Sequence, residues 1–214
     1  MAANSIYNVL SNSFHNVSQI LLVPVIIILL IFVLYAVASL GGLIYEYNSR
    51  RKTRTDFVQI ENIILSISSG NSDELIREID TSKMPSRHKE ILLKLVKTSN
   101  LSPDARELMA RKMIENEEVM VAKRLEKTDI IAKIGPAVGL MGTLIPLGPG
   151  LAALGAGNIQ ELASHLILAF DAAILGMASA ALGFTISKIR RRWYEEELSN
   201  LEGMAESVLE VLKS

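Results

Sequence analysis

The first 45 residues contain no Asp, Glu, Lys or Arg, and this absence constrains the fold more than any other feature. The centre of the stretch, LLVPVIIILLIFVLYAVASL, matches the roughly 20 apolar residues that cross a bilayer as a helix. A secretory signal peptide is the alternative, but it would need a basic N-terminal region and a shorter apolar stretch, and the sequence has neither. We therefore expect a first transmembrane helix at 20–45.

Two further stretches lack charge: 134–160, and 162–187 apart from Asp171. They are rich in Gly and Ala, and such small residues let helix backbones approach closely inside lipid. The small residues that recur on one face are Gly135, Gly139 and Gly142 in the first stretch, and Ala169, Ala172, Ala173, Gly176, Ala180 and Gly183 in the second. The pattern predicts a second transmembrane helix at 131–154, an outer turn at 155–161 and a third transmembrane helix at 162–187.

Basic residues next to the spans predict the orientation. Lys and Arg cluster at 50–54, 123–133 and 188–192, and all three clusters lie on one side of the predicted membrane. The positive-inside rule makes that side cytoplasmic. We therefore expect residues 1–19 outside the membrane, a cytoplasmic helical domain at 46–130 and a cytoplasmic C-terminal helix at 188–214, in a multi-pass protein of the plasma (inner) membrane.

Apolar residues between the first two spans recur at helical spacing, and no stretch alternates as a strand would. Phe57 to Ile67 predicts a helix that ends at Gly70-Asn71, and shorter helices are expected around Leu75–Ile79 and after Pro85. Ser102-Pro103 resembles a helix cap followed by a first-turn proline, and it predicts a long helix that runs on into the second span. The apolar stripe of the tail is Leu198, Leu201, Met204, Val208 and Val211. The predicted fold is all-α.

Composition gives little support for enzymatic chemistry. The chain has no cysteine and only three scattered histidines, so thiol catalysis and the common metal-ligand patterns are excluded. A net charge of −1 provides no global basic field for nucleic acid. Residues 148–153 match G-x-G-x-x-A, but a dinucleotide site needs a preceding strand, and this match lies in a predicted span. We expect no cofactor, no bound metal and no enzymatic activity.

Asp171 is the one ionisable residue well inside a predicted span. A charge at mid-bilayer costs roughly 2.5–3.5 kcal/mol even on mild scales, so Asp171 is expected to be protonated, to face water or to meet a partner chain. One interpretation is that Asp171 lies on an ion pathway or binds a partner. The other is that it is protonated and forms a hydrogen bond that packs it against a neighbouring helix. Thr143 could relay a proton or hold a water, or it could bond to its own backbone. Pro146 and Pro149 are expected to bend or break the second span.

Two motifs resemble those of the MotA/TolQ/ExbB family, the large subunits of ion-driven membrane motors. RLEKTDIIAKIGPAVGLMGTL is similar to the family's A-P-x-x-G-L-x-G-T region, and LASHLILAFDAAILGMASAALGF to its L-A-x-x-x-x-x-A-F-D-T-T-x-x-G-L region. The matching positions are Pro136, Gly139, Leu140, Gly142 and Thr143, then Leu162, Ala163, Ala169, Phe170, Asp171 and Gly176. Ala172 and Ala173 stand where the family has threonines, and the prolines after Thr143 are also unlike the family.

The resemblance implies a homopentamer that surrounds a small, single-span partner similar to ExbD, TolR or MotB. Ions, usually protons, would pass between the two and drive mechanical work, with no nucleic acid involved. The positions it implies for the ion pathway are Thr143, Asp171, Ala173 and Gly176. The rival hypothesis is a membrane scaffold that assembles a complex without conducting ions.

Overall fold

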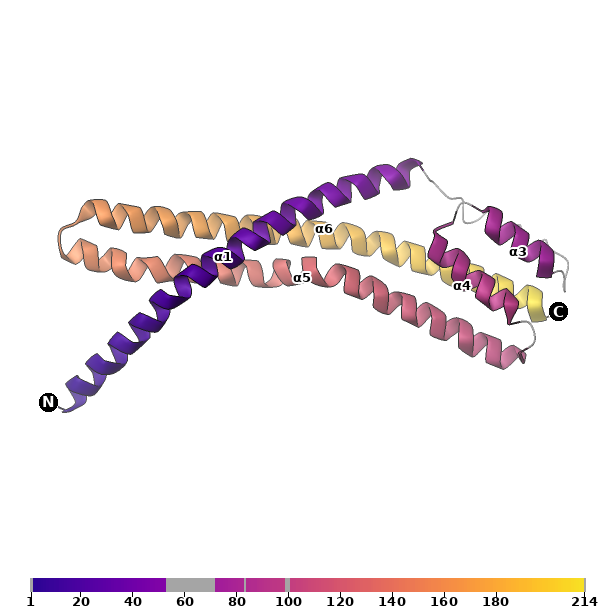
Figure 1. Ribbon diagram of the computed structural model, residues 1–214, viewed down its shortest axis with the longest axis horizontal. Helices are drawn as coiled ribbons and strands as arrows, with labels where there is room; N and C mark the ends of the chain where they lie inside the picture. The colour runs from indigo at the N-terminus through magenta and orange to yellow at the C-terminus, as the bar shows by residue number, and fades with distance from the viewer. Residues whose placement is uncertain (1, 53–71, 83, 99–100, 214) are drawn as a thin grey trace. The chain divides into compact units, whose positions relative to one another are not determined.

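The structure, a computed structural model, describes residues 2–52, 72–82, 84–98 and 101–213. Within these ranges the regular secondary structure is entirely α-helical (Figure 1). The helices are α1 (Ala2–Lys52), α3 (Ser72–Thr81), α4 (Ser86–Lys97), α5 (Pro103–Gly155) and α6 (Ile159–Lys213). The all-helical prediction is confirmed, while the helix predicted from Phe57 to Ile67 lies outside the described residues.

The chain divides into two compact units, and the long helices α1, α5 and α6 contribute to both. Unit 1 comprises residues 1–44 and 126–188, and unit 2 comprises residues 45–125 and 189–214. Unit 1 contains the predicted spans, whereas unit 2 contains the two short helices α3 and α4. Each unit is described by itself below.

Within unit 1, α5 and α6 run antiparallel and are joined by a short turn (Figure 1). Gly157 has a φ of 77°, a left-handed conformation that glycine adopts without a Cβ penalty. Asn158 then caps α6, because its Oδ1 accepts a hydrogen bond from the Glu161 N–H at 3.1 Å. A turn residue and a cap in succession explain why the chain reverses at this point.

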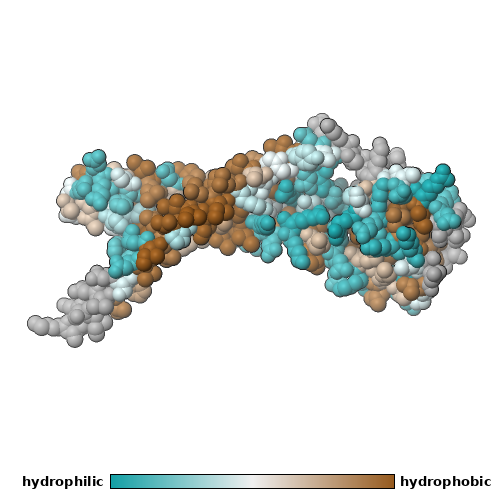
Figure 2. All heavy atoms as spheres, viewed as in Figure 1, coloured by the Kyte–Doolittle hydropathy of each residue, from teal (hydrophilic) through white to brown (hydrophobic). Residues whose placement is uncertain are grey.

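Three helices in the described part of the chain are long and apolar enough to cross a membrane: α1, α5 and α6. On the face drawn in Figure 2, the apolar surface of unit 1 gathers where α1 crosses α5 and α6. The long helix predicted from Pro103 does continue through the second apolar stretch as α5. The sequence predicts a bend or a break at Pro146 and Pro149, and a break does not occur, because α5 is continuous through both prolines.

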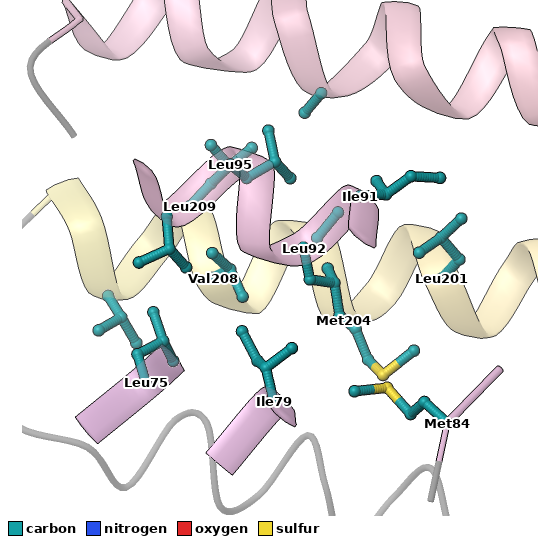
Figure 3. Close-up of a cluster of buried hydrophobic side chains, with 14 residues drawn as sticks. Leu75, Ile79, Met84, Ile91, Leu92, Leu95, Leu201, Met204, Val208 and Leu209 are labelled. Atoms are coloured by element: carbon teal, nitrogen blue, oxygen red, sulfur yellow. The ribbon is translucent and has the colours of Figure 1, made fainter. Parts of the chain in front are cut away.

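Unit 2 is built around an apolar core shared by four helices (Figure 3). Side chains of α3 and α4 meet the apolar stripe of the α6 tail, and α5 adds Ala110. The fully buried members are Leu75, Ile79, Leu92, Leu95, Val96, Leu201, Met204 and Val208. Four residues of the stripe predicted for the tail lie in this core, namely Leu201, Met204, Val208 and Val211, whereas Leu198 is half-buried outside it. Leu108, Val119 and Met120 of α5 are exposed.

Charged and aromatic side chains tie the end of α1 to α6 within unit 2. Arg50 pairs with Glu197 at 2.9 Å, and Arg190 pairs with Glu46 at 3.2 Å. The Arg50 guanidinium also lies 5.0 Å from the centroid of the Trp193 ring, a distance that suits a cation–π contact. Two of the basic residues that predicted the membrane orientation thus also hold two helices together.

Burial lowers the pKa of His88 below its ordinary value of 6.5, and the negative charges of Glu197 and Glu117 offset only part of this effect. The side chain lies in the unit 2 interior, beside the ion pair of Arg87 with Glu117. Its Nδ1 has no hydrogen-bond partner among the described residues. His88 is therefore held in its neutral form at neutral pH.

Unit 2 should lose stability as the pH falls below about 6.5, because the unfolded chain then binds a proton that folded His88 resists. The loss should grow until the pH reaches the lowered pKa of folded His88, and it should be absent in His88→Leu. Trp193 is the only tryptophan in the chain and lies in unit 2, so its fluorescence can follow denaturant unfolding between pH 5 and 8. Equal pH dependence in wild type and His88→Leu would contradict this assignment.

Candidate functional site

The contact between α5 and α6 in unit 1 is a line of small residues, here called the seam. Its members are Gly135, Gly139 and Gly142 of α5, and Ala169, Ala172, Gly176, Ala180 and Gly183 of α6. At its centre, a Cβ added to Gly176 would lie 2.6 Å from the Cα of Gly139 and 2.9 Å from the Gly135 carbonyl oxygen. The two backbones therefore touch directly, and no side chain fits between them.

Helix α1 covers one side of the seam. A Cβ on Gly142 would lie 2.6 Å from the Ala172 Cβ and 3.3 Å from a methyl carbon of Leu29. Val25 and Leu29 of α1 are buried in one apolar cluster with Ala172 and residues of α5. Glycine at 142 thus lets three helices meet at one level.

Asp171 lies on the opposite side of α6 from the seam. Five residues separate it from Gly176, which at 3.6 residues per turn places it about 140° round the helix. The side chain is exposed, as are its apolar neighbours Phe170 and Ile174. No described residue gives it a hydrogen bond or an ion pair. The described residues therefore do not provide the hydrogen bond to a neighbouring helix that the packing interpretation of this acid requires within one chain.

Asp171 belongs to a line of small or polar residues on the exposed surface of α6. Ser164, Asp171, Ala178 and Thr185 are seven residues apart and all exposed, and seven residues return to the same face within about 20°. The Ser164 and Thr185 hydroxyls donate to the carbonyls of Gln160 and Ala181 in their own helix. Their oxygens can still accept hydrogen bonds, so this line, here called the α6 polar line, can hold water or a polar group.

Among the described residues, no hydrogen bond joins Thr143 to Asp171. The Thr143 hydroxyl donates to the Leu140 carbonyl at 2.7 Å, which is the backbone bond considered as its alternative role. Ala173 is half-buried at the edge of the seam, with its carbonyl oxygen 3.7 Å from a Cβ added to Gly139. Gly176 is buried between the two backbones and so packs α5 against α6, and its place in the ion pathway stays a prediction.

Sequence reasoning missed two polar contacts between the helices of unit 1. Ser187 of α6 donates to the Asp129 carboxylate of α5, at the end of the seam away from the turn. Gln19 of α1 donates from Nε2 to the Ile145 carbonyl of α5 at 3.3 Å. The second contact had a signal in the sequence, because Pro149 marks the Ile145 carbonyl as lacking its usual donor four residues later.

Three long apolar helices, with an acid exposed on one of them, define a multi-pass membrane protein whose exposed α6 surface carries polar groups. The model of the MotA/TolQ/ExbB proton channel family matches residues 78–203, which is more than half of the chain. The chain therefore belongs to the MotA/TolQ/ExbB proton channel family, as the resemblance suggested. Neither the search of curated proteins nor that of solved structures gives a match.

Proposed function

We propose that this protein is the large subunit of a proton-driven membrane motor. Several copies, five by family resemblance, would surround a single-span partner similar to ExbD, TolR or MotB. Protons would pass between the copies and this partner, and their flow would be converted into mechanical work. Asp171 would bind and release the proton, and the protein would need neither a cofactor nor enzymatic chemistry.

The observation that carries the proposal is the exposure of Asp171 on an apolar helix. A lone acid in a span is costly unless water or another chain reaches it, and the seam and α1 leave it uncovered within one chain. A second chain or the partner would therefore complete its surroundings. The α6 polar line supplies acceptor groups above and below it, at Ser164 and Thr185.

The proposed placement in the cell follows from charge. Unit 2 carries most of the basic residues that flank the spans, so we place it in the cytoplasm and the α5–α6 turn outside the plasma membrane. The scaffold hypothesis remains the rival, and the backbone hydrogen bond of Thr143 is the observation that favours it. A scaffold has no need of an uncovered acid in lipid, and this consideration supports the motor.

The test is purification of the protein from its native membrane in mild detergent, followed by identification of what accompanies it. We expect an oligomer that retains a short protein with one membrane span. That complex, reconstituted into vesicles with an internal pH dye, should conduct protons when a potential is applied. A complex with no single-span partner and no conductance above empty vesicles would support the scaffold.

A further inference from the structure

The prolines in α5 remove hydrogen bonds from the part of the helix next to Thr143. A proline lacks the amide hydrogen that would bond to the carbonyl four residues earlier, so Pro146 removes a donor from Gly142 and Pro149 removes one from Ile145. In a membrane such carbonyls need another donor, and a neighbouring helix can supply it. This part of α5 is nevertheless helical without a break.

Gln19 of α1 supplies the donor for the Ile145 carbonyl. Its side-chain amide nitrogen lies 3.3 Å from that oxygen, and the side chain is half-buried. One turn earlier on α1, His15 lies against α5 as well, because a Cβ added to Gly148 would be 3.9 Å from the His15 Cε1. Helix α1 thus approaches α5 at the Ile145 carbonyl and again beside Gly148.

The packing of α5 against the seam connects the Gln19–Ile145 contact to the segment of α5 that carries Thr143. Thr143 lies between Gly142, which is in van der Waals contact with α1 and α6, and the carbonyl that Gln19 binds. The Ile145 side chain is itself buried in the cluster that includes Val25 and Leu29. A bend at Pro149 would therefore act on the segment that carries Thr143.

We propose that Gln19 is a positioning residue for the ion pathway: its amide replaces the N–H that Pro149 lacks and keeps the Thr143 segment of α5 straight against α1. The role in the pathway rests on the function proposed above, whereas the role in holding α5 does not. Interhelical hydrogen bonds in membranes contribute roughly 0.6 kcal/mol on average. That value predicts an increase of about threefold in a displaced α5 conformer when the bond is lost.

The test compares Gln19→Leu, Pro149→Ala and the double variant in the complex with its partner. The chain has no cysteine, so spin labels can be placed on cysteines introduced at the exposed positions Val17 of α1 and Leu151 of α5. Gln19→Leu should broaden the distance distribution between the labels and lower proton flux. Pro149→Ala restores a backbone donor for Ile145, so the double variant should recover both measurements. Gln160→Leu, an exposed glutamine at the start of α6, is the matched control and should change neither.

An unchanged label distribution in Gln19→Leu would overturn the proposal. So would a double variant that stays as broad as Gln19→Leu while Pro149→Ala alone behaves as wild type, because a general packing defect would not be rescued by a backbone donor. A wild-type complex without flux would overturn the proposed function, and the label distances would still decide what Gln19 does.

Discussion

Replacing Gly176 with alanine is expected to separate α5 from α6 and to destabilise the protein, although alanine is the better helix former. In an ordinary helix interior this exchange stabilises by roughly 0.5–1 kcal/mol. At Gly176 the new Cβ would lie 2.6 Å from the Gly139 Cα and 2.9 Å from the Gly135 carbonyl oxygen. Both contacts are with backbone, which cannot rotate away, so we expect a cost of about 1–3 kcal/mol, typical of overpacked cores, and a larger one for Gly176→Leu.

The matched control is Gly41→Ala in α1, where an added Cβ meets nothing within 4 Å. It should stabilise the protein by up to about 1 kcal/mol, so the two glycine-to-alanine changes are predicted to have opposite signs. Thermal unfolding in mild detergent gives the stability, and light scattering gives the oligomer mass, which should fall for Gly176→Leu. Ala173→Leu, at the half-buried edge of the seam, should also lower the mass. If Gly176→Ala melts at the wild-type temperature with an unchanged mass, the backbones do not meet as described.

Asp171→Asn is expected to leave the complex assembled while reducing proton flux to the level of empty vesicles. Asparagine has nearly the same volume and keeps hydrogen-bonding capacity, but it cannot bind and release a proton. The side chain lies outside the seam, so its replacement should not disturb the contact between α5 and α6. Flux is measured with an internal pH dye in vesicles that contain the complex and its single-span partner.

Glu161→Gln is the control for removal of a carboxylate from α6. Glu161 is exposed at the start of the helix, beside the turn, and this variant should conduct as wild type does. Thr143→Ala should conduct less than wild type but more than Asp171→Asn, since its hydroxyl is already bonded to the Leu140 carbonyl. Wild-type flux in an assembled Asp171→Asn complex would assign this acid to packing and move the pathway to Thr143 and the acid of the partner.

Local patterns in the sequence were sufficient for the helices and for the family. The absence of charge over 45 residues and the two Gly- and Ala-rich stretches predicted spans that coincide with long apolar helices. The Ser102-Pro103 pair predicted where α5 begins, and the turn predicted at 155–161 contains the point where the chain reverses. These features depend on neighbouring residues alone. A helix in lipid satisfies its backbone hydrogen bonds within its own segment, and a cap bonds to amides two or three residues away.

The prolines of α5 show the limit of local reasoning. Pro146 and Pro149 each remove a backbone hydrogen bond, and a rule confined to one helix predicts a bend or a break there. The break does not occur, and the donor that replaces one of the lost bonds comes from Gln19, more than a hundred residues earlier in the chain. The sequence around Pro149 marks the carbonyl that lacks a donor, but it does not show which residue supplies one.

The sequence by itself determined that the chain is helical, that three stretches can cross a membrane and that Asp171 is an acid within one of them. Only the tertiary structure decided that Gly176 is buried against Gly139, that Asp171 lies on the other side of α6, and that His88 is held neutral in the unit 2 core. Helical periodicity assigns residues to a face. Small residues occur on more than one face of the third span, so periodicity alone does not show which face meets α5. The face of α6 that meets α5 is the one on which the two backbones can approach most closely, and this depends on the small residues of both helices together.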